Sequence, residues 1–131
     1  MPQPSTSTDS AFAAALAHFD AEAYRDALLA FEQCWFADRS DFLRGMIKLC
    51  NALNQLRLGL VTAPRRTLAG AAELLAPYAP QHAGLDVAAL CDYIAAVRAC
   101  IPATLESGQG RVEWERVPRH RLSSFGTAES G

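Results

Sequence analysis

Apolar side chains recur every three or four positions along most of residues 12–101. Two neighbouring stretches, residues 24–35 and 42–56, carry this pattern most regularly, and a short polar link separates them. Spacings of three and four place side chains on one face of an α-helix, so each stretch predicts an amphipathic helix. Two such helices with facing stripes predict an antiparallel helical hairpin. The stripes consist of Tyr24, Leu28, Phe31 and Trp35, and of Phe42, Met46, Leu49, Leu53 and Leu56.

The same spacing predicts further helices before and after this hairpin, over residues 8–20, 62–76 and 87–101. Ser40 or Asp41 is expected to cap the second helix of the hairpin, and Asp86 the last helix of the chain. Gly59 is expected to end the hairpin, because glycine readily adopts the left-handed conformation that often follows a helix. The sequence therefore predicts an all-α fold, a single helical bundle of about five helices around a central antiparallel helical hairpin.

The two ends of the chain differ in composition from the bundle. Residues 1–7 are rich in proline, serine and threonine and are expected to be a disordered N-terminal segment. Residues 8–102 form the predicted bundle domain, and residues 103–131 are expected to be a flexible or extended C-terminal tail. Within that tail, a short alternation around Val112 and Trp114 is consistent with an extended segment that docks on the bundle.

Length and charge limit the classes of function. The 131 residues suffice for one domain, and the formal net charge of -2 gives no global attraction to nucleic acid or anionic lipid. Nucleic-acid binding through the arginines is therefore the weakest function considered. No apolar run approaches membrane-spanning length, and the first residues lack the features of a secretory signal, so a cytoplasmic location is expected.

The four cysteines lie in or at the end of apolar runs and form no Cys-x-x-Cys pair, so buried thiols are expected at Cys34, Cys50, Cys91 and Cys100. The histidines lack metal-ligand spacing, and neither a metal site nor a cofactor is predicted. No nucleophile, paired-carboxylate or phosphate-binding motif stands out, and no catalytic residue is assigned.

The candidate functional site lies along the hairpin. A polar pocket between its two helices would be lined by Glu32, Trp35, Arg39, Arg44 and Lys48, if Glu32 meets Arg44 or Lys48 across the helix pair. The alternative is that Arg44 and Lys48 belong to an ordinary solvated helix face, where an ion pair contributes under about 1 kcal/mol.

Gly45 stands inside the second helix of the hairpin, where glycine costs roughly 1 kcal/mol relative to alanine. A glycine is tolerated there when another group must approach closely. The first candidate for that group is Trp35, and an incidental glycine is the alternative.

One set of residues has an order and spacing that recur in a known family. The set consists of Ala27, Glu32, Trp35, Arg39, Phe42, Gly45, Ile47, Leu53, Gly59, Leu74, Leu75, Tyr78 and the run Gly84–Val87. In these positions the chain resembles a small prokaryotic helical family, the domain of unknown function 309. The resemblance covers roughly residues 12–101, and the family implies an all-α bundle without an established activity.

The chain departs from the family pattern at its polar positions. Leu28 and Leu29 stand where the family has a His-Glu pair, and Arg44 and Lys48 replace two glutamines. If other members use the His-Glu pair for chemistry, this chain lacks the groups for that route. A weaker likeness, to a tetratricopeptide helix pair around residues 19–32, lacks the second repeat that such an architecture needs.

Two classes of function follow from these observations. The first is a non-enzymatic interaction or scaffold module, which binds a protein partner or a second copy of itself as a homodimer. The second is a small hydrolase-like enzyme that uses the polar pocket between the hairpin helices. An exposed apolar patch would favour the first class, and a cavity with converging polar groups would favour the second.

Overall fold

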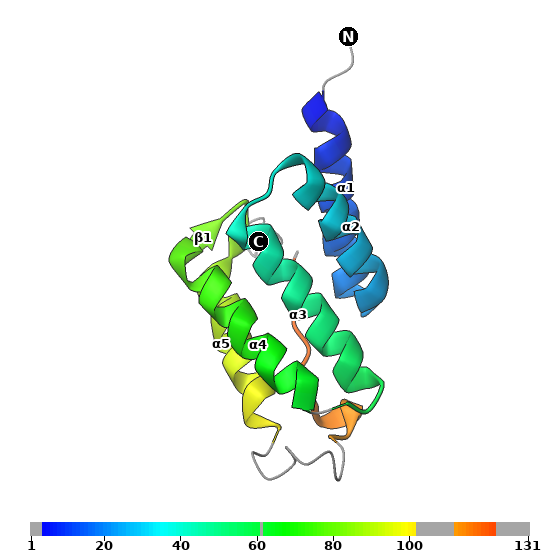
Figure 1. Ribbon diagram of the computed structural model, residues 1–131, viewed down its shortest axis with the longest axis vertical. Coiled ribbons are helices and arrows are strands. Elements are labelled where there is room, and N and C mark those ends of the chain that lie inside the picture. The colour runs from blue at the N-terminus through cyan, green and yellow to red at the C-terminus, as the bar shows by residue number, and fades with distance from the viewer. Residues whose placement is uncertain (1–3, 61, 102–111, 123–131) are drawn as a thin grey trace, which may run out of the picture.

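The computed structural model describes residues 4–60, 62–101 and 112–122 (Figure 1). Helices dominate the described residues, and the sheet is a single two-residue pair of strands, so the predicted all-α bundle is confirmed. The helices are α1 Pro4–Asp20, α2 Tyr24–Ala37, α3 Asp41–Arg57, α4 Thr62–Leu75 and α5 Val87–Ala99. The shorter elements are η1 Ala76–Tyr78, β1 Gln81–His82, β2 Leu85–Asp86 and η3 Trp114–Arg116.

Helix α3 lies in the middle of the bundle, with α2 on one side and α4 on the other (Figure 1). Its whole predicted stripe is buried, which confirms the hairpin with α2. The inward face of α2 is turned slightly from the predicted one. Tyr24 and Phe31 are buried, but Ala27 and Cys34 take the buried positions expected for Leu28 and Trp35. Both predicted side chains pack at the margin of the core instead.

Gly45 lies where side chains of α4 approach the backbone of α3 closely. A Cβ atom at this position would lie 2.7 Å from Cγ of Leu75 and 3.3 Å from Cβ of Leu74. The prediction that Trp35 is the close neighbour is therefore wrong, because the nearest atoms belong to α4. Glycine is needed at this position for a close contact, as predicted, but the contact is between α3 and α4 and not between α2 and α3.

The helix ends follow the predicted capping chemistry at several positions. Oγ of Ser40 accepts a hydrogen bond from the amide of Leu43 at 3.2 Å, at the start of α3. Asp86 accepts one from the amide of Ala89 at 2.9 Å, at the start of α5. Gly59 has a φ of +93° after α3. Each of these groups satisfies, or allows the backbone to satisfy, a free polar group at a helix end.

Helix α1 begins earlier than predicted. It starts at Pro4, so residues 4–7 are helical rather than disordered, while residues 1–3 lie outside the described part of the chain. Proline fits the first turn of a helix because its missing amide has no intrahelical partner there. The helix can therefore extend by one turn beyond the predicted start.

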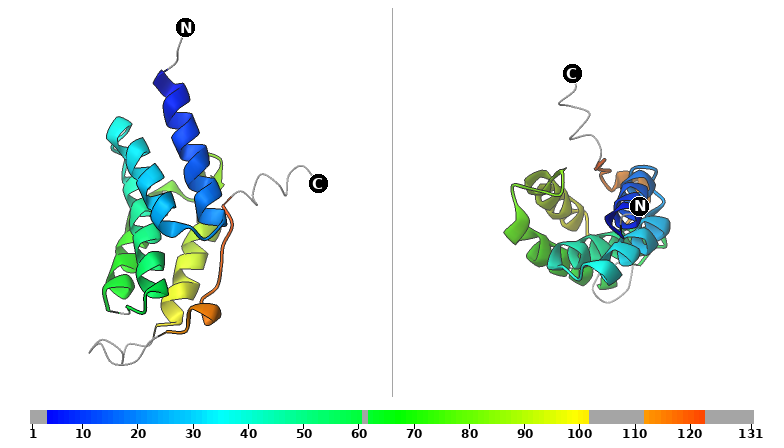
Figure 2. Two further views of the ribbon diagram at one scale, coloured as in Figure 1. Left: turned by 90° about the vertical axis from the view of Figure 1, so that its right-hand side faces the viewer. Right: turned by 90° about the horizontal axis from the view of Figure 1, so that it is seen from above.

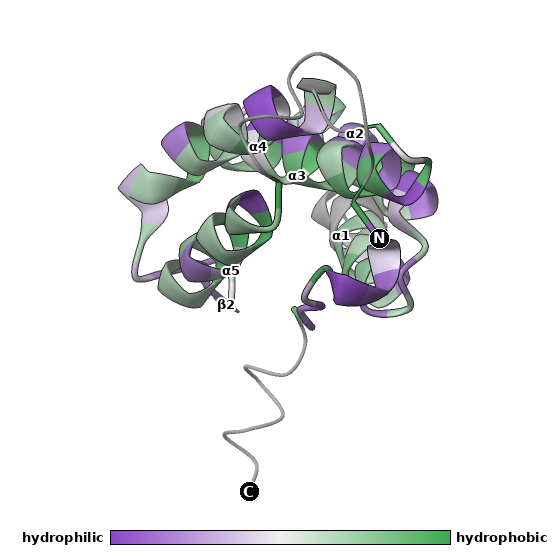
Figure 3. Ribbon diagram, turned by 90° about the horizontal axis from the view of Figure 1, so that it is seen from below, coloured by the Kyte–Doolittle hydropathy of each residue, from purple (hydrophilic) through white to green (hydrophobic). Residues whose placement is uncertain are grey.

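The C-terminal segment, residues 112–122, completes the core. The helices form an incomplete ring when viewed along the bundle, and this segment passes between α1 and α5 (Figures 2 and 3). Val117 and Leu122 are buried, and Val112 and Trp114 pack against the core. The predicted docking of Val112 and Trp114 is confirmed, but Trp114 begins a 3₁₀ turn rather than an extended strand. A tail from residue 103 is wrong for residues 112–122, and residues 103–111 and 123–131 lie outside the described residues.

No helix in the described ranges has the length and apolar character needed to cross a membrane.

Gly45 and Gly70 offer a matched test of the α3–α4 contact. Gly45→Ala is expected to lower the free energy of unfolding by roughly 1–3 kcal/mol, because the new methyl group meets the fully buried Leu75. Gly70→Ala is expected to raise it by up to about 1 kcal/mol, because a Cβ there only touches Lys48 at 3.6 Å and alanine favours a helix. Urea denaturation followed by circular dichroism measures both, and a Gly45→Ala variant as stable as Gly70→Ala would contradict the close contact.

Candidate functional site

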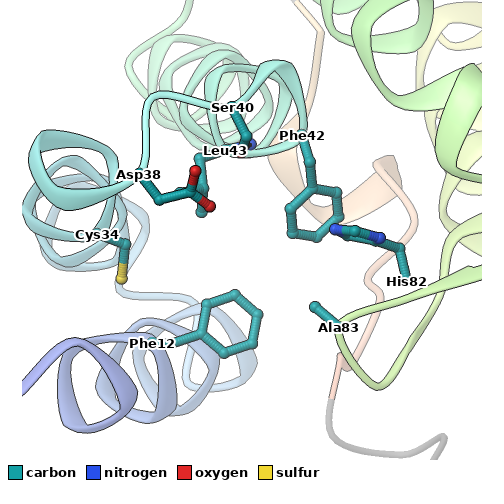
Figure 4. A pocket seen from close by; sticks show the side chains of 8 residues that line it. All are labelled: Phe12, Cys34, Asp38, Ser40, Phe42, Leu43, His82 and Ala83. Carbon is teal, nitrogen blue, oxygen red and sulfur yellow. Dashed lines mark hydrogen bonds between the residues drawn. The ribbon is translucent and has the colours of Figure 1, made fainter. Parts of the chain in front are cut away.

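A cavity of about 230 Å³ opens where α1, the end of α2, the start of α3 and the β1–β2 hairpin meet (Figure 4). We call it the link pocket, because the link between α2 and α3 forms part of its rim. Ala83 and Gly84 have φ of +54° and +79°, so the hairpin reverses tightly and brings β1 to the pocket. The pocket is lined by Phe12, Cys34, Asp38, Ser40, Phe42, Leu43, His82 and Ala83.

Aromatic rings make up much of the pocket wall. The centroid of the Phe42 ring lies 4.6 Å from that of His82 and 5.5 Å from that of Tyr78, so these rings form one cluster. On the opposite wall, the Phe12 ring packs edge-on against Phe31 at 6.0 Å. Ring pairs at these separations attract each other and hold a defined orientation. Figure 4 shows Phe12 facing Phe42 and His82 across the cavity.

Three polar side chains line the pocket besides His82. The carboxylate of Asp38 points into the cavity, is exposed, and forms no ion pair with any described residue (Figure 4). Ser40 is already engaged as the cap of α3. Burial raises the pKa of the Cys34 thiol, so this group stays protonated and is a weak nucleophile at neutral pH. Figure 4 also shows Cys34 and His82 on opposite sides of the cavity, which disfavours a thiol–imidazole pair.

The residues predicted to line a polar pocket lie in several places. The guanidinium carbon of Arg39 lies 4.5 Å from the centroid of the Trp35 ring, so these two side chains do meet. Arg44 instead pairs with Asp41 of its own helix at 3.2 Å. The side chain of Lys48 lies along Gly70 of α4, on the far side of α3 from α2.

The link pocket is not the predicted pocket. Neither it nor a second cavity beside Trp114 is lined by Glu32, Trp35, Arg39, Arg44 or Lys48. Trp35 Nε1 is buried and has no hydrogen-bond partner among the described residues. The arrangement of Arg44 and Lys48 matches the alternative of an ordinary helix face more closely than that of a shared polar pocket.

The second cavity, of about 320 Å³, lies beside a group of charged and aromatic side chains that holds the C-terminal segment. Glu22 accepts a hydrogen bond from Nε of Arg119 at 2.9 Å and from Arg57 at 3.5 Å. Both guanidinium groups lie over the Trp114 ring, at 4.1 and 5.2 Å from its centroid. Arg57 also lies over the ring of Tyr24. These contacts tie the segment to α3 and to the turn between α1 and α2 and leave no unpaired arginine among them for a ligand.

Two further contacts fix the end of the segment. The amide of Leu122 donates to Asp20 at 2.6 Å, and the hydroxyl of Tyr93 donates to the carbonyl of Pro118 at 2.9 Å. His120 stacks on Tyr93, with ring centroids 5.0 Å apart, and burial lowers its pKa. The segment is thus held by polar contacts with the C-terminal end of α1 and with the middle of α5. We regard this group as structural.

The described histidine, cysteine, aspartate and glutamate side chains form no cluster suited to hold a metal ion. Cys34 and Cys50 are buried as predicted, while Cys91 and Cys100 are partly exposed.

In comparisons with known proteins, no family model, no curated protein and no solved structure matches this chain. The resemblance to the domain of unknown function 309 family stays a prediction from the sequence. The candidate site therefore rests on the geometry of this molecule alone.

The sequence did not predict the link pocket, because its residues come from separate segments. Phe42 belongs to a predicted apolar stripe, Phe12 lies in the helix predicted over residues 8–20, and Asp38 lies in the polar link of the predicted hairpin. His82 and Ala83 lie in a hairpin that was not predicted, since its strands have only two residues each. The Ala83–Gly84 step, between two prolines and a capping aspartate, was the available signal for a tight turn.

Tyr24 and Tyr93 give a matched test of the polar contacts under the C-terminal segment. The hydroxyl of Tyr24 is buried without a hydrogen-bond partner among the described residues, whereas that of Tyr93 donates to Pro118. Tyr24→Phe is expected to leave the free energy of unfolding unchanged or raise it by up to about 1 kcal/mol. Tyr93→Phe is expected to lower it by about 1 kcal/mol. Chemical denaturation at pH 7 measures both, and equal losses would contradict the assignment.

The buried side chain of Tyr24 also predicts that the stability of the fold depends on pH. Burial raises the pKa of Tyr24 to about 12, above the value near 10 of an exposed tyrosine. The unfolded chain therefore loses this proton first, and stability falls as the pH rises from about 10 towards 12. Tyr24→Phe is expected to make that fall shallower. The slope of stability against pH should decrease by an amount that corresponds to at most one proton. A variant whose stability falls as steeply as that of the wild type over this range would contradict the assignment.

Proposed function

We propose that this protein is a non-enzymatic interaction module that holds one side chain of a partner protein in the link pocket. The observation that carries the proposal is the pocket itself, a preformed cavity with ring walls and a polar rim. Its volume of about 230 Å³ is below the range of roughly 300–1,000 Å³ typical of sites for drug-sized ligands, and suits a single large side chain. Anchor side chains that fill such pockets dominate the affinity of many protein interfaces.

A hydrolytic function has less support. The groups predicted to form a polar pocket between α2 and α3 are spread over the bundle, and Arg44 and Lys48 are turned to Asp41 and α4. In the link pocket, the raised pKa of Cys34 disfavours a thiolate nucleophile. Arg57 and Arg119 are engaged with Glu22, so these two arginines do not support binding of nucleic acid.

A small apolar probe tests the proposed function. N-acetyl-leucinamide, titrated into ¹⁵N-labelled protein, is expected to cause saturable shifts at the amides of Ser40, Leu43 and Ala83. The Kd should be millimolar, since about a dozen non-hydrogen atoms at roughly 0.3 kcal/mol each give about 4 kcal/mol. Cys34→Met places a larger side chain in the cavity and is expected to abolish these shifts.

The control is the same change at Cys91, which lies on α5 and does not line the pocket. Cys91→Met should bind the probe like the wild type, and well-dispersed spectra of both variants show that they are folded. Shifts that never saturate, or equal binding by both variants, would refute the proposal.

Self-association through α2 is a second candidate. Leu29 and Phe36 are 48% and 67% exposed, and their spacing of seven places them on the same outward face. Exposed apolar side chains that share a helix face are a common feature of interfaces. If this face pairs with itself, sedimentation velocity should detect a dimer that Phe36→Glu abolishes and Leu60→Glu, outside α2, retains. A wild-type monomer at high micromolar concentration would dismiss this candidate.

A further inference from the structure

We propose that the link pocket selects an alkylammonium cation, such as the end of a lysine side chain, methylated or not, or a quaternary ammonium headgroup. The inference rests on the proposed function, because it names the chemistry of the group that the pocket holds. It follows from the walls, the charge and the size of the cavity.

The walls present rings from separate elements to one space. Phe12 comes from α1, Phe42 from the first turn of α3, and His82 from β1. Ring faces attract cations through their quadrupole, and several rings around one cavity are the arrangement that proteins use for quaternary ammonium groups. The contacts with Phe31 and Tyr78 hold the Phe12 and Phe42 rings in place before any ligand arrives.

The charge at the pocket is negative. Among the eight lining residues Asp38 is the only one with a formal charge when histidine is neutral, and its carboxylate points into the cavity (Figure 4). The neighbouring cations are engaged elsewhere, because Arg39 lies over Trp35 and Arg44 pairs with Asp41. The carboxylate of Asp38 is therefore available to an incoming cation.

The helix ends at the pocket do not reverse this sign. The C-terminal end of α2 and the N-terminal end of α3 both reach the rim, so their dipoles oppose each other. The amide of Leu43, at the start of α3, already donates to Ser40. An anion would find no lysine or arginine among the eight described lining residues, and it would meet the carboxylate of Asp38.

Size agrees with this chemistry. A cavity of about 230 Å³ accommodates a trimethylammonium group or the end of a lysine side chain, and is small for a nucleotide. A small polar group, such as the side chain of a serine or threonine of a partner, would leave the faces of the pocket's rings uncovered. The cation that best fills the space is one whose charge is spread over several methyl or methylene groups.

Choline and its uncharged analogue 3,3-dimethyl-1-butanol separate charge from shape. Both are titrated into ¹⁵N-labelled protein of residues 1–131 at pH 8, above the range in which histidine normally takes up a proton. Choline is expected to bind about tenfold more tightly than the analogue, through the rings and the carboxylate. The shifts should map to Ser40, Leu43 and Ala83.

Two pairs of variants assign the preference to the named groups. Asp38→Asn is expected to reduce the preference for choline to about threefold, while Asp92→Asn, an exposed aspartate on α5, should leave it unchanged. Phe12→Leu keeps an apolar wall without the ring and should weaken choline more than the analogue. Phe36→Leu, at an exposed ring outside the pocket, is its control.

N-acetyl-lysinamide and its Nε-trimethyl derivative distinguish the source of the cation. Tighter binding of either than of choline indicates a lysine of a protein partner, and tighter binding of choline indicates a free or lipid headgroup. Both outcomes support a pocket for an alkylammonium cation, but only the first supports the partner side chain of the proposed function.

The failures of the two proposals differ. Equal binding of choline and the analogue, or binding of N-acetyl-leucinamide alone, would refute the proposed selectivity for a cation. The proposed function as an interaction module would not be refuted by either result. Binding of none of the probes would overturn both.

Discussion

The close approach of α3 and α4 at Gly45 is the contact on which the arrangement of the other helices depends. With no side chain at this position, Leu75 can pack directly on the backbone of α3. This fixes the distance between the two helices and leaves the opposite face of α3 to α2. Helix α3 is thus covered on both sides, and its apolar stripe becomes the centre of the core.

The link pocket is a consequence of the same arrangement. Helix α4 ends at Leu75, close to the start of α3, and the chain then turns through η1 into the β1–β2 hairpin. His82 is thereby carried to Phe42, while α1 and α2 bring Phe12 and Cys34 from the other side. The cavity is therefore formed by the ends of elements rather than by the interior of the hairpin, where the polar site was expected.

The sequence predicted what depends on local periodicity. The helices, the caps at Ser40 and Asp86 and the stop at Gly59 all follow from spacing and backbone chemistry over a few residues. The neighbour of Gly45 did not follow, because a helical period tells which face is buried and not which helix covers it. Val117 and Leu122 were missed for a related reason: isolated apolar residues in a polar stretch have no period.

The candidate site was the least predictable part. Its lining residues are up to about seventy positions apart, and each has an ordinary reason to be where it is, as core, cap or turn. Only the tertiary structure brings their rings and the carboxylate of Asp38 to one space. A sequence alone favours sites whose groups lie on one or two helices, which is why Glu32, Arg44 and Lys48 were grouped together.

The docking of the C-terminal segment has a consequence for the order in which parts of the protein fold during synthesis. Leu122 binds Asp20, and Arg119 binds Glu22, so residues about a hundred positions apart must meet before the ring of helices closes. Contacts of such long range form late and slow the search for the native state. On the ribosome, all five helices can be complete while the gap between α1 and α5 still exposes core side chains to solvent. Until the last buried leucine emerges, this exposed apolar surface makes the incomplete fold prone to aggregation.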